Sequence, residues 1–308
     1  MSDYLQHELA MSELCQLYSI SRKTGYKWID RYLRLGPAGL EDLSRKPRHA
    51  PNETRADIVE ALIETRRRHP SWGARKLNAL LHKRNPRWEL PHKSTVNDIL
   101  HRHGMIPKKR VRRRIGHPGK PTTQILAPND TWCADFKGQF RTGDGIYCYP
   151  LTVTDGFSRY LLGCQSLPST SVEGAKPVFA RIFKEFGLPR RIRTDNGAPF
   201  ATTTLARLSS LSAWWVRLGI FPELIEPGCP QQNGRHERMH RTLKADTTRP
   251  PAGSMAAQQR RFNAFLDVFN NERPHEALDM QTPAACYAPS PRPMPDKIPP
   301  LEYPNRFE

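Results

Sequence analysis

Residues 131–136 are Thr-Trp-Cys-Ala-Asp-Phe, an apolar run typical of a buried strand, with one carboxylate, Asp135, near its end. A second short run with strand character, 191–194, leads directly into Asp195. A third acid, Glu237, lies at the start of a helical pattern. Ligand sites on sheets covered by helices gather where strands end. We therefore predict that these three acids meet at one place.

Strand-like and helical runs follow one another around residues 131–136. Turn sequences at 143–145 and 156–158 separate three strand-like runs, and helical patterns come after them. The predicted strands are 131–140, 146–155, 160–167, 191–194 and 220–225, and the predicted helices are 172–186, 205–219 and the segment that contains Glu237. The order β-β-β-α-β-α-β-α predicts an α/β domain in which helices pack on a mixed sheet.

The helix of Glu237 has a distinct polar face. At 100° per residue, Arg241 and Lys244 lie within about 40° of Glu237 around the helix, and Met239 and Leu243 lie near the opposite side. An acid that holds a metal beside two cations that hold phosphate suits phosphoryl transfer. A Glu–Arg pair four residues apart is also a common surface feature of helices, so the neighbouring aspartates decide between the two interpretations.

Each aspartate also has a simpler interpretation. Asp195 begins an Asp-Asn-Gly sequence, which is frequent in turns. Asp135 has a rival in Asp155, which we rank lower because it adjoins the turn after the second strand. If the acids form one site, their oxygen ligands favour two Mg²⁺ (or Mn²⁺) ions over zinc.

Positive charge is concentrated in the amino-terminal part of the chain. The 308 residues include 48 Lys and Arg against 30 Asp and Glu, a net charge of +18. Residues 1–127 carry 26 basic and 12 acidic side chains, a net of +14, and residues 128–308 carry 22 and 18, a net of +4. This asymmetry predicts a module that binds a polyanion, although a generally basic, solvated surface is an alternative.

Residues 1–35 have the pattern of a helix-turn-helix domain. Ser21 is a suitable cap for the second helix. One face of that helix is formed by Gly25, Trp28, Ile29, Tyr32 and Leu33. The side chains predicted to face DNA are Arg22, Lys23, Lys27 and Arg31. A basic outer face suits a recognition helix, and an ordinary helical hairpin is the alternative.

Residues 54–106 predict a second helix-turn-helix domain, with helices at 55–68, 73–82 and 95–103. Ser94 is the expected cap of the last helix, which ends at Gly104 in a Schellman pattern. Thr95, Asn97 and Arg102 are expected to face DNA. The alternative is a purely structural three-helix bundle.

Two linkers carry further basic residues. The first, 36–53, is rich in Pro and Gly and contains Arg45, Lys46 and Arg48, and the second, 107–127, contains Lys108, Lys109, Arg110, Arg112, Arg113 and Arg114. Extended basic segments bind phosphates or enter a minor groove. A plain linker is an equally good interpretation of the first segment, and a solvated tether is the alternative for the second.

The remaining features are compatible with a cytoplasmic protein that associates with the nucleoid when bound to DNA. The six cysteines form no C-x-x-C pair, which argues against a zinc finger and against a disulfide framework. No signal peptide or transmembrane run is present in the sequence. Residues 249–308 predict a helix near 255–271 and a Pro-rich, irregular tail.

Together, these motifs resemble a known family. The resemblance lies in Trp132-x-x-Asp135, in residues 151–159, in Asp195-Asn196-Gly197, in residues 230–244, and in Asn271-Glu272-Arg273-Pro274-His275-Glu276-Ala277-Leu278. These segments are similar to the retroviral-integrase-type catalytic core and, more closely, to bacterial insertion-sequence transposases with an Asp-Asp-Glu site. Residues 20–28 and 72–77 also match, especially the insertion sequence 481 group.

The resemblance implies a ribonuclease-H-like core at 128–248, with Asp135, Asp195 and Glu237 as catalytic metal ligands and Lys244 as a basic partner. The interval between Asp195 and Glu237 is 41 residues, longer than in retroviral relatives. We expect the surplus to lie in 205–219.

The activity implied is that of a DNA transposase. Such an enzyme binds the terminal inverted repeats of its element, hydrolyses their 3′ ends and joins them to double-stranded target DNA as a homo-oligomer, a dimer or tetramer. Two other interpretations stay open. A catalytically silent, domesticated transposase would act as a DNA-binding regulator, and a stand-alone nuclease would not need two recognition modules.

Overall fold

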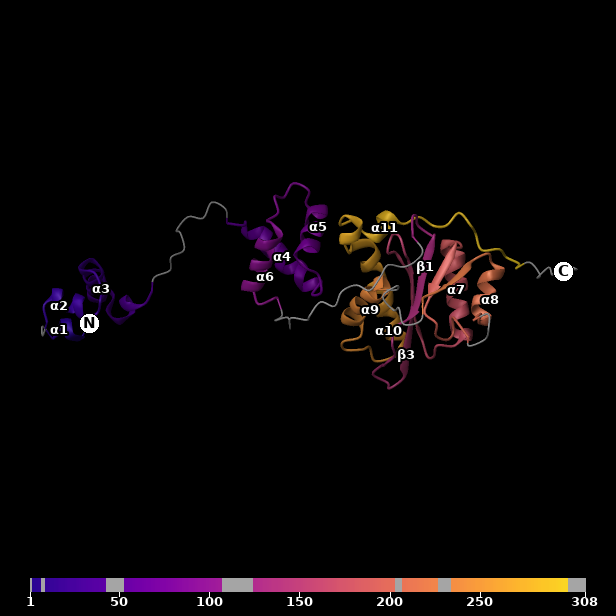
Figure 1. Ribbon diagram of the computed structural model, residues 1–308, viewed down its shortest axis with the longest axis horizontal. Helices are drawn as coiled ribbons and strands as arrows, with labels where there is room; N and C mark the ends of the chain where they lie inside the picture. The colour runs from indigo at the N-terminus through magenta and orange to yellow at the C-terminus, as the bar shows by residue number, and fades with distance from the viewer. Residues whose placement is uncertain are drawn as a thin grey trace, which may run out of the picture. The chain divides into compact units, whose positions relative to one another are not determined.

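The computed structural model describes residues 2–6, 9–42, 53–106, 124–202, 207–226 and 234–298. The chain divides into two compact units, Met1–Glu53 and Thr54–Glu308. Figure 1 labels the α-helices of both units and strands β1 and β3.

The first unit is a helix-turn-helix arrangement of short helices. Its elements are α1 (Ser2–Leu5), α2 (Met11–Leu17), α3 (Arg22–Leu35) and a 3₁₀ turn (Gly36–Leu40). Ser21 caps α3 as predicted, because its side chain accepts a hydrogen bond from the Thr24 N–H. Gly25 lets α3 approach α2 closely, since an added Cβ would lie 3.0 Å from the Cys15 sulfur. Leu33, predicted to lie on the buried face, is exposed.

Residues 54–106 form a three-helix bundle with its own core. The helices are α4 (Ala56–Arg68), α5 (Ala74–Arg84) and α6 (Lys93–Arg102). Leu62 and Leu77 are fully buried, and Trp72 and Leu100 are nearly so. Each of the three helices therefore contributes at least one buried apolar residue to the core of the bundle.

The two ends of α6 test the predicted caps. At its carboxyl end, Met105 N–H bonds to Leu100 O and Gly104 N–H to His101 O, with Gly104 at φ +66°, which confirms the Schellman motif. At its amino end the prediction was wrong, because α6 begins at Lys93 with His92 as the cap residue.

The second domain of this unit is built on a mixed sheet. Its strands are β1 (Thr131–Phe136), β2 (Phe140–Arg141), β3 (Tyr147–Asp155), β4 (Leu161–Leu167), β5 (Arg191–Thr194) and β6 (Phe221–Leu224). β3 pairs antiparallel with β1, β2 and β4, and β5 pairs parallel with β1 and β6. Five strands therefore lie in the order β4-β3-β1-β5-β6, with β2 as a short extension. The predicted first strand was too long, since β1 ends at Phe136.

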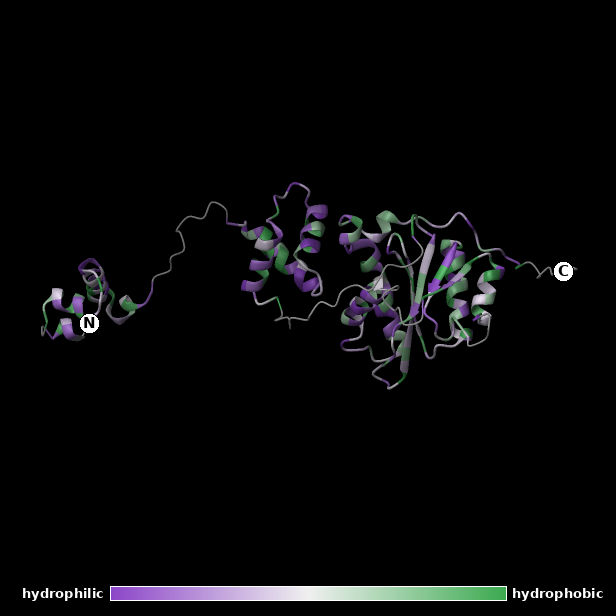
Figure 2. Cartoon of the chain, in the orientation of Figure 1, coloured by the Kyte–Doolittle hydropathy of each residue, from purple (hydrophilic) through white to green (hydrophobic). Residues whose placement is uncertain are grey.

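Helices cover both faces of the sheet. They are α7 (Val172–Phe186), α8 (Ser210–Arg217), α9 (Gly234–Thr247), α10 (Met255–Asp267) with a π-helical continuation (Val268–Glu272), a 3₁₀ turn (Glu276–Leu278) and α11 (Pro283–Cys286). One core joins β1, β3 and β5 to α7 and α8, and another joins β3 and β4 to α9 and α10. Figure 2 shows green, hydrophobic stretches on α7 and α8 beside the sheet. The predicted fold class, an α/β core after all-α helix-turn-helix modules, is confirmed.

Two side-chain amides cover the outer edge of β4. Gln259 of α10 accepts from Ser166 N–H and donates to Cys164 O. Asn270 accepts from Leu161 N–H and donates to Leu161 O. The backbone groups that face away from β3 at both ends of β4 are therefore paired.

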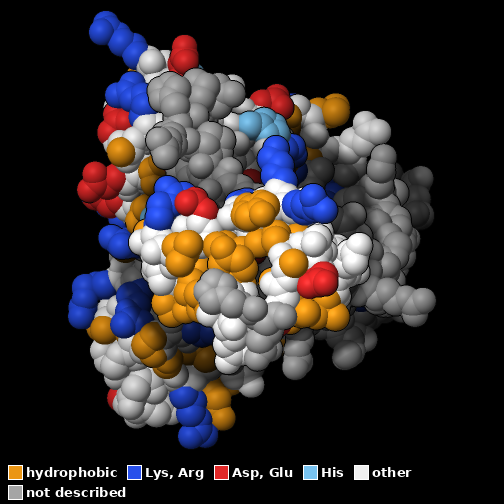
Figure 3. Space-filling model, turned by 90° about the vertical axis from the view of Figure 1, so that its left-hand side faces the viewer, with side chains coloured by type: hydrophobic (Ala, Val, Ile, Leu, Met, Phe, Trp, Pro, Cys, Tyr) orange, Lys and Arg blue, Asp and Glu red, His pale blue; other side chains and the backbone are white. Residues whose placement is uncertain are grey.

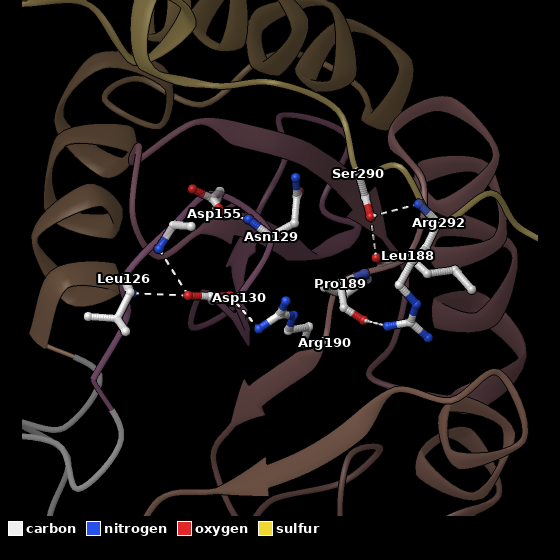
Figure 4. A network of polar contacts seen from close by, with 10 residues as sticks. Leu126, Asn129, Asp130, Asp155, Leu188, Pro189, Arg190, Ser290 and Arg292 are labelled. Atoms are coloured by element: carbon white, nitrogen blue, oxygen red, sulfur yellow. Dashed lines mark hydrogen bonds and ion pairs between the residues drawn. The ribbon is translucent and has the colours of Figure 1, made fainter.

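The carboxyl-terminal segment is irregular, as predicted, but it is firmly held. Ser290 Oγ donates to Leu188 O, and Arg292 donates to Pro189 O, contacts that Figure 4 draws together. Tyr287 stacks on Tyr160 with ring centroids 4.4 Å apart. These contacts tie residues 287–292 to the connection between α7 and β5 and to the residue that precedes β4.

Candidate active site

Asp135 and Asp195 lie at the same edge of the sheet. Asp135 is the penultimate residue of β1, and Asp195 directly follows β5. Because these two strands are parallel and adjacent, their carboxyl ends meet. Both carboxylates are partly buried, and Asp195 Oδ1 accepts the Gly197 N–H at 3.2 Å.

Glu237 brings a third carboxylate to Asp135. It is an exposed residue in the first turn of α9, a helix that packs against β1. Burial, together with the negative charge of Asp195 and a smaller effect of Glu237, raises the pKa of Asp135 to about 7, although the Phe136 N–H and Lys137 oppose this rise. The three predicted acids therefore share one electrostatic environment.

The acids are suited to hold cations. A carboxylate with a pKa near 7 in the company of two others is a site of crowded negative charge. Divalent cations relieve such crowding, and oxygen ligands suit Mg²⁺ and Mn²⁺. The donor set of the described residues thus fits the metal ions that the sequence predicts.

The orientation of α9 agrees with its sequence pattern. Met239 is 5% exposed and Leu243 is fully buried, while Glu237, Arg241 and Lys244 are all exposed. An acid and two cations therefore lie together on the solvent side of the helix, next to the strand ends.

Two histidines on the buried side of α9 were missed by the sequence analysis. His236 and His240 are 1% and 6% exposed. The His240 Nδ1 atom lies 3.6 Å from Asp135 Oδ2. Burial lowers the pKa of His236 to about 3 and the pKa of His240 still further, so both rings are neutral at pH 7. Their spacing of four residues, which places them on one face, was the available signal.

The histidines pack against two threonines of β3. Thr152 Oγ1 lies 2.6 Å from Nε2 of both His236 and His240, and Thr154 Oγ1 lies 3.0 Å from Nδ1 of His236. Thr152 and Thr154 point to the same side of β3, because side chains two residues apart share a face. A layer of polar side chains thus lies between α9 and the sheet, next to Asp135.

Asp155, the rival of Asp135, is a structural residue. It pairs with Trp132 near the start of β1, whereas Asp135 pairs with Thr152. Its carboxylate accepts hydrogen bonds from the Asn129 N–H (2.8 Å) and from the Ser158 N–H (2.7 Å). Figure 4 shows Asp155 beside Asn129, turned into this local network. The ranking of Asp135 above Asp155 agrees with this geometry.

Most described residues that were predicted to contact DNA are exposed, with one exception. Arg22, Lys23, Lys27, Asn97, Arg102, Arg241 and Lys244 are exposed, and Thr95 is half-buried. Arg31 is 7% exposed, because its guanidinium stacks on Trp28 and donates to Glu41 O. The outward orientation predicted for Arg31 was therefore wrong. Arg45, Lys46, Arg48, Lys108, Lys109, Arg110, Arg112, Arg113 and Arg114 lie outside the described residues.

The first unit exposes large apolar side chains, among them Leu17 (63%), Tyr18 (56%) and Leu33 (66%). In Figure 3 hydrophobic side chains gather on the face turned to the viewer, with Lys and Arg around them. Apolar surface of this kind is typical of a region that contacts another molecule.

A basic cavity lies apart from the three acids. Its volume is about 470 Å³, and the cations that line it are Lys76, Arg159, Arg238, Arg241 and Arg273. His275 also lines it, and its buried Nε2 atom has no hydrogen-bond partner among the described residues. These residues are too far apart in sequence for a motif search to group them.

Among the described residues, no helix is both long and apolar enough to cross a membrane.

Family models match most of the chain. An integrase core domain model matches residues 126–230, a second integrase core domain model matches residues 218–283, and a homeodomain-like domain model matches residues 24–100. The first of these spans both Asp135 and Asp195, and the second spans Glu237.

Relatives with similar sequences include a bacterial and a viral protein. The chain is 32% identical over 257 residues to an uncharacterized 39.2 kDa protein of insertion element IS476 from Xanthomonas euvesicatoria, a match that covers 80% of this chain and 69% of that protein. It is 28% identical over 193 residues to the Gag-Pol polyprotein of baboon endogenous virus, which covers 62% of this chain but only 11% of the polyprotein.

A solved structure with similarity to the chain is the HTLV-2 integrase catalytic core domain in complex with magnesium, with a TM-score of 0.43 and 16% identity over 54% of this chain and 100% of that one. The family assignment rests on the sequence matches alone. By its integrase core domains and its similarity to the Xanthomonas insertion-element protein, the chain belongs to the insertion-element transposases with an integrase-like core.

Proposed function

We propose that this protein is an active DNA transposase whose catalytic metal ligands are Asp135, Asp195 and Glu237. The observation that carries the proposal is the placement of Asp135 and Asp195 at the adjacent carboxyl ends of β1 and β5, with Glu237 in the first turn of α9, which packs against β1. A structural role would not require carboxylates at the ends of both β1 and β5 and a third on the helix that packs against β1.

The reaction consists of two phosphoryl transfers at one site. Two Mg²⁺ or Mn²⁺ ions bound by the acids would activate the attacking oxygen and stabilise the leaving one. In hydrolysis, a water oxygen bonds to phosphorus and the bond from phosphorus to the 3′ oxygen of the element end breaks. In strand transfer, the freed 3′-hydroxyl attacks a phosphorus of the target DNA, whose own 3′ oxygen leaves. The protein forms no covalent bond to DNA.

The exposed cations position the DNA in this proposal. Arg241 and Lys244 lie on the same side of α9 as Glu237, where they contact the phosphates next to the reacting bond. The helix-turn-helix segments of 1–35 and 54–106 contact the inverted repeats. Joining two element ends to one target takes at least two protomers, so we infer a dimer or tetramer on DNA.

Oligonucleotide assays test this proposal. Protein with Mg²⁺ or Mn²⁺ should cleave and join duplexes that carry the ends of the element. Asp135→Asn should bind the same duplexes with the parent's affinity, yet react at less than about one hundredth of its rate. Glu173→Gln, a change of an exposed acid in the first turn of α7, is the matched control and should react like the parent.

Two results would point to the other interpretations. A parent protein that binds the ends but never cleaves them, with any divalent metal, acts as a regulator. Cleavage without any joined product indicates a nuclease. Full activity of Asp135→Asn would refute the site assignment.

A further inference from the structure

Asp135, His236 and His240 form a group of possible ligands in which one atom from each lies within 4.8 Å of the others. Which ring nitrogen is open to a ligand follows from the hydrogen bonds that the group already makes.

Thr152 fixes the tautomers of both rings. Its hydroxyl has three partners, Asp135 O at 3.1 Å and the two Nε2 atoms at 2.6 Å. A hydroxyl donates one hydrogen bond and accepts two. The carbonyl oxygen of Asp135 can only accept, so the single Thr152 proton goes to it. Both Nε2 atoms must then carry a proton and donate to Thr152.

The two Nδ1 atoms are therefore acceptors in neutral rings, and they differ in their surroundings. Nδ1 of His236 lies 3.0 Å from the Thr154 hydroxyl, and the other acceptor near that hydroxyl, Cys133 O, lies at 3.5 Å, so the nearer Nδ1 atom takes the single Thr154 proton. Nδ1 of His240 faces Asp135 Oδ2 at 3.6 Å. This separation is too long for a hydrogen bond, and both atoms are acceptors when the carboxylate is ionised. Two acceptor atoms repel each other, and a cation bound between His240 Nδ1 and Asp135 Oδ2 would attract both.

We propose that His240 Nδ1 is a ligand of the same divalent ion that Asp135 holds, which makes this ion's site a mixed nitrogen and oxygen site. The proposal rests on the metal site of the proposed function. His240 has the environment of a metal-binding histidine, whose second nitrogen normally donates to an oxygen that fixes the ring. Here that oxygen is the Thr152 hydroxyl, which is itself tied to the backbone of Asp135.

The ligand set has a consequence for metal choice. Imidazole nitrogen binds transition metals well, whereas Mg²⁺ prefers oxygen. We expect His240→Asn to weaken Mn²⁺ binding by about tenfold or more, with an effect of less than about threefold on Mg²⁺. Isothermal titration calorimetry of the full chain without DNA measures both.

Pulsed electron paramagnetic resonance gives the direct test, because Mn²⁺ bound to imidazole shows electron-spin-echo modulation from the coordinated ¹⁴N. The parent protein loaded with Mn²⁺ should show this modulation, and His240→Asn should lose it. His236→Asn, which removes an imidazole from the same helix face, should keep it. Asp135→Asn should bind too little Mn²⁺ to give a signal.

The outcomes separate this inference from the proposed function. If the parent binds Mn²⁺ in a manner that depends on Asp135 but shows no ¹⁴N modulation, His240 is not a ligand, and the metal site itself stands. Modulation that persists in His240→Asn also overturns the inference. If the parent shows no Mn²⁺ binding that depends on Asp135, both the inference and the metal site fail.

Discussion

Asp135 and Asp155 lie on neighbouring strands and are both held in largely buried surroundings, but their partners differ. Burial raises the pKa of Asp155, but its carboxylate accepts hydrogen bonds from Asn129 and Ser158, which oppose this rise. Asp135 faces two other acids and an acceptor nitrogen. The first arrangement stabilises a loop, and the second is the arrangement that the proposed metal site requires.

Asparagine at each position should separate these roles. In Asp155→Asn the new NH₂ group faces either Asn129 N–H or Ser158 N–H, so we expect a loss of about 1–3 kcal/mol in the free energy of unfolding with unchanged stabilisation by Mg²⁺. Asp135→Asn should keep the stability of the metal-free protein and lose the stabilisation by Mg²⁺. Thermal and urea denaturation with and without Mg²⁺ measure both. A Mg²⁺ response that disappears in Asp155→Asn would contradict the assignment.

At the level of single residues, the sequence predicts where charged residues lie on helices and strands better than it predicts which groups their side chains contact. The three acids could be located because strand and helix periodicity places them at element ends. The inward turn of Arg31 could not, because it depends on stacking with Trp28 and on the Glu41 carbonyl ten residues away. The roles of His236 and His240 were equally hidden, since they depend on threonines from another element.

The two sides of helix α9 differ: one side packs against the rest of the domain, and the other carries exposed charged residues. Leu243 is fully buried against β3, β4 and α10, whereas Lys244, the next residue, is exposed. Leu243→Ala should therefore cost about 2–5 kcal/mol of folding stability. Lys244→Ala should stay within about 0.5 kcal/mol of the parent but bind DNA more weakly, with a salt dependence reduced by about one unit of slope.

Denaturation curves and fluorescence anisotropy at several salt concentrations measure these effects. Lys184→Ala on α7 is the matched control, because Lys184 is an exposed lysine of the helix layer on the other face of the sheet. An equal loss of DNA affinity in Lys184→Ala would show that net charge, and not the α9 face, governs binding.

Elements with local signals were predicted well. The end of α6 followed from Gly104, which adopts the left-handed conformation that a Schellman motif needs. The start of α6 was misjudged because Asn78 of α5 holds the Pro91 carbonyl at 2.7 Å and so directs the chain into the helix before Ser94. The ordered contacts of Tyr287 and Arg292 were likewise not predictable, since Tyr287 stacks on the distant Tyr160 ring and Arg292 donates to the distant Leu218 carbonyl.

The two compact units should be separable in function. The described cores of the bundle and of the sheet domain contain residues only from Thr54 onward. A protein that lacks residues 1–53 should therefore unfold cooperatively and keep the full stabilisation by Mg²⁺. It should bind element ends more weakly and distinguish them less from scrambled duplexes, because one recognition module is missing. Anisotropy titrations against both duplexes, together with melting curves, measure this. Loss of the Mg²⁺ response in the truncated protein would contradict the prediction.

The amides of Gln259 and Asn270 along β4 limit how copies of this protein can associate. An open sheet edge is a template on which a strand of a second molecule can pair. On this edge the outward backbone groups at both ends of β4 are already occupied, and the opposite edge strand, β6, contains Pro222, which has no N–H to offer. Continuous sheets across subunits, and the fibrous aggregates that grow in the same way, are thereby disfavoured. The proposed assembly of protomers on DNA is therefore expected to use helices, loops or the nucleic acid itself.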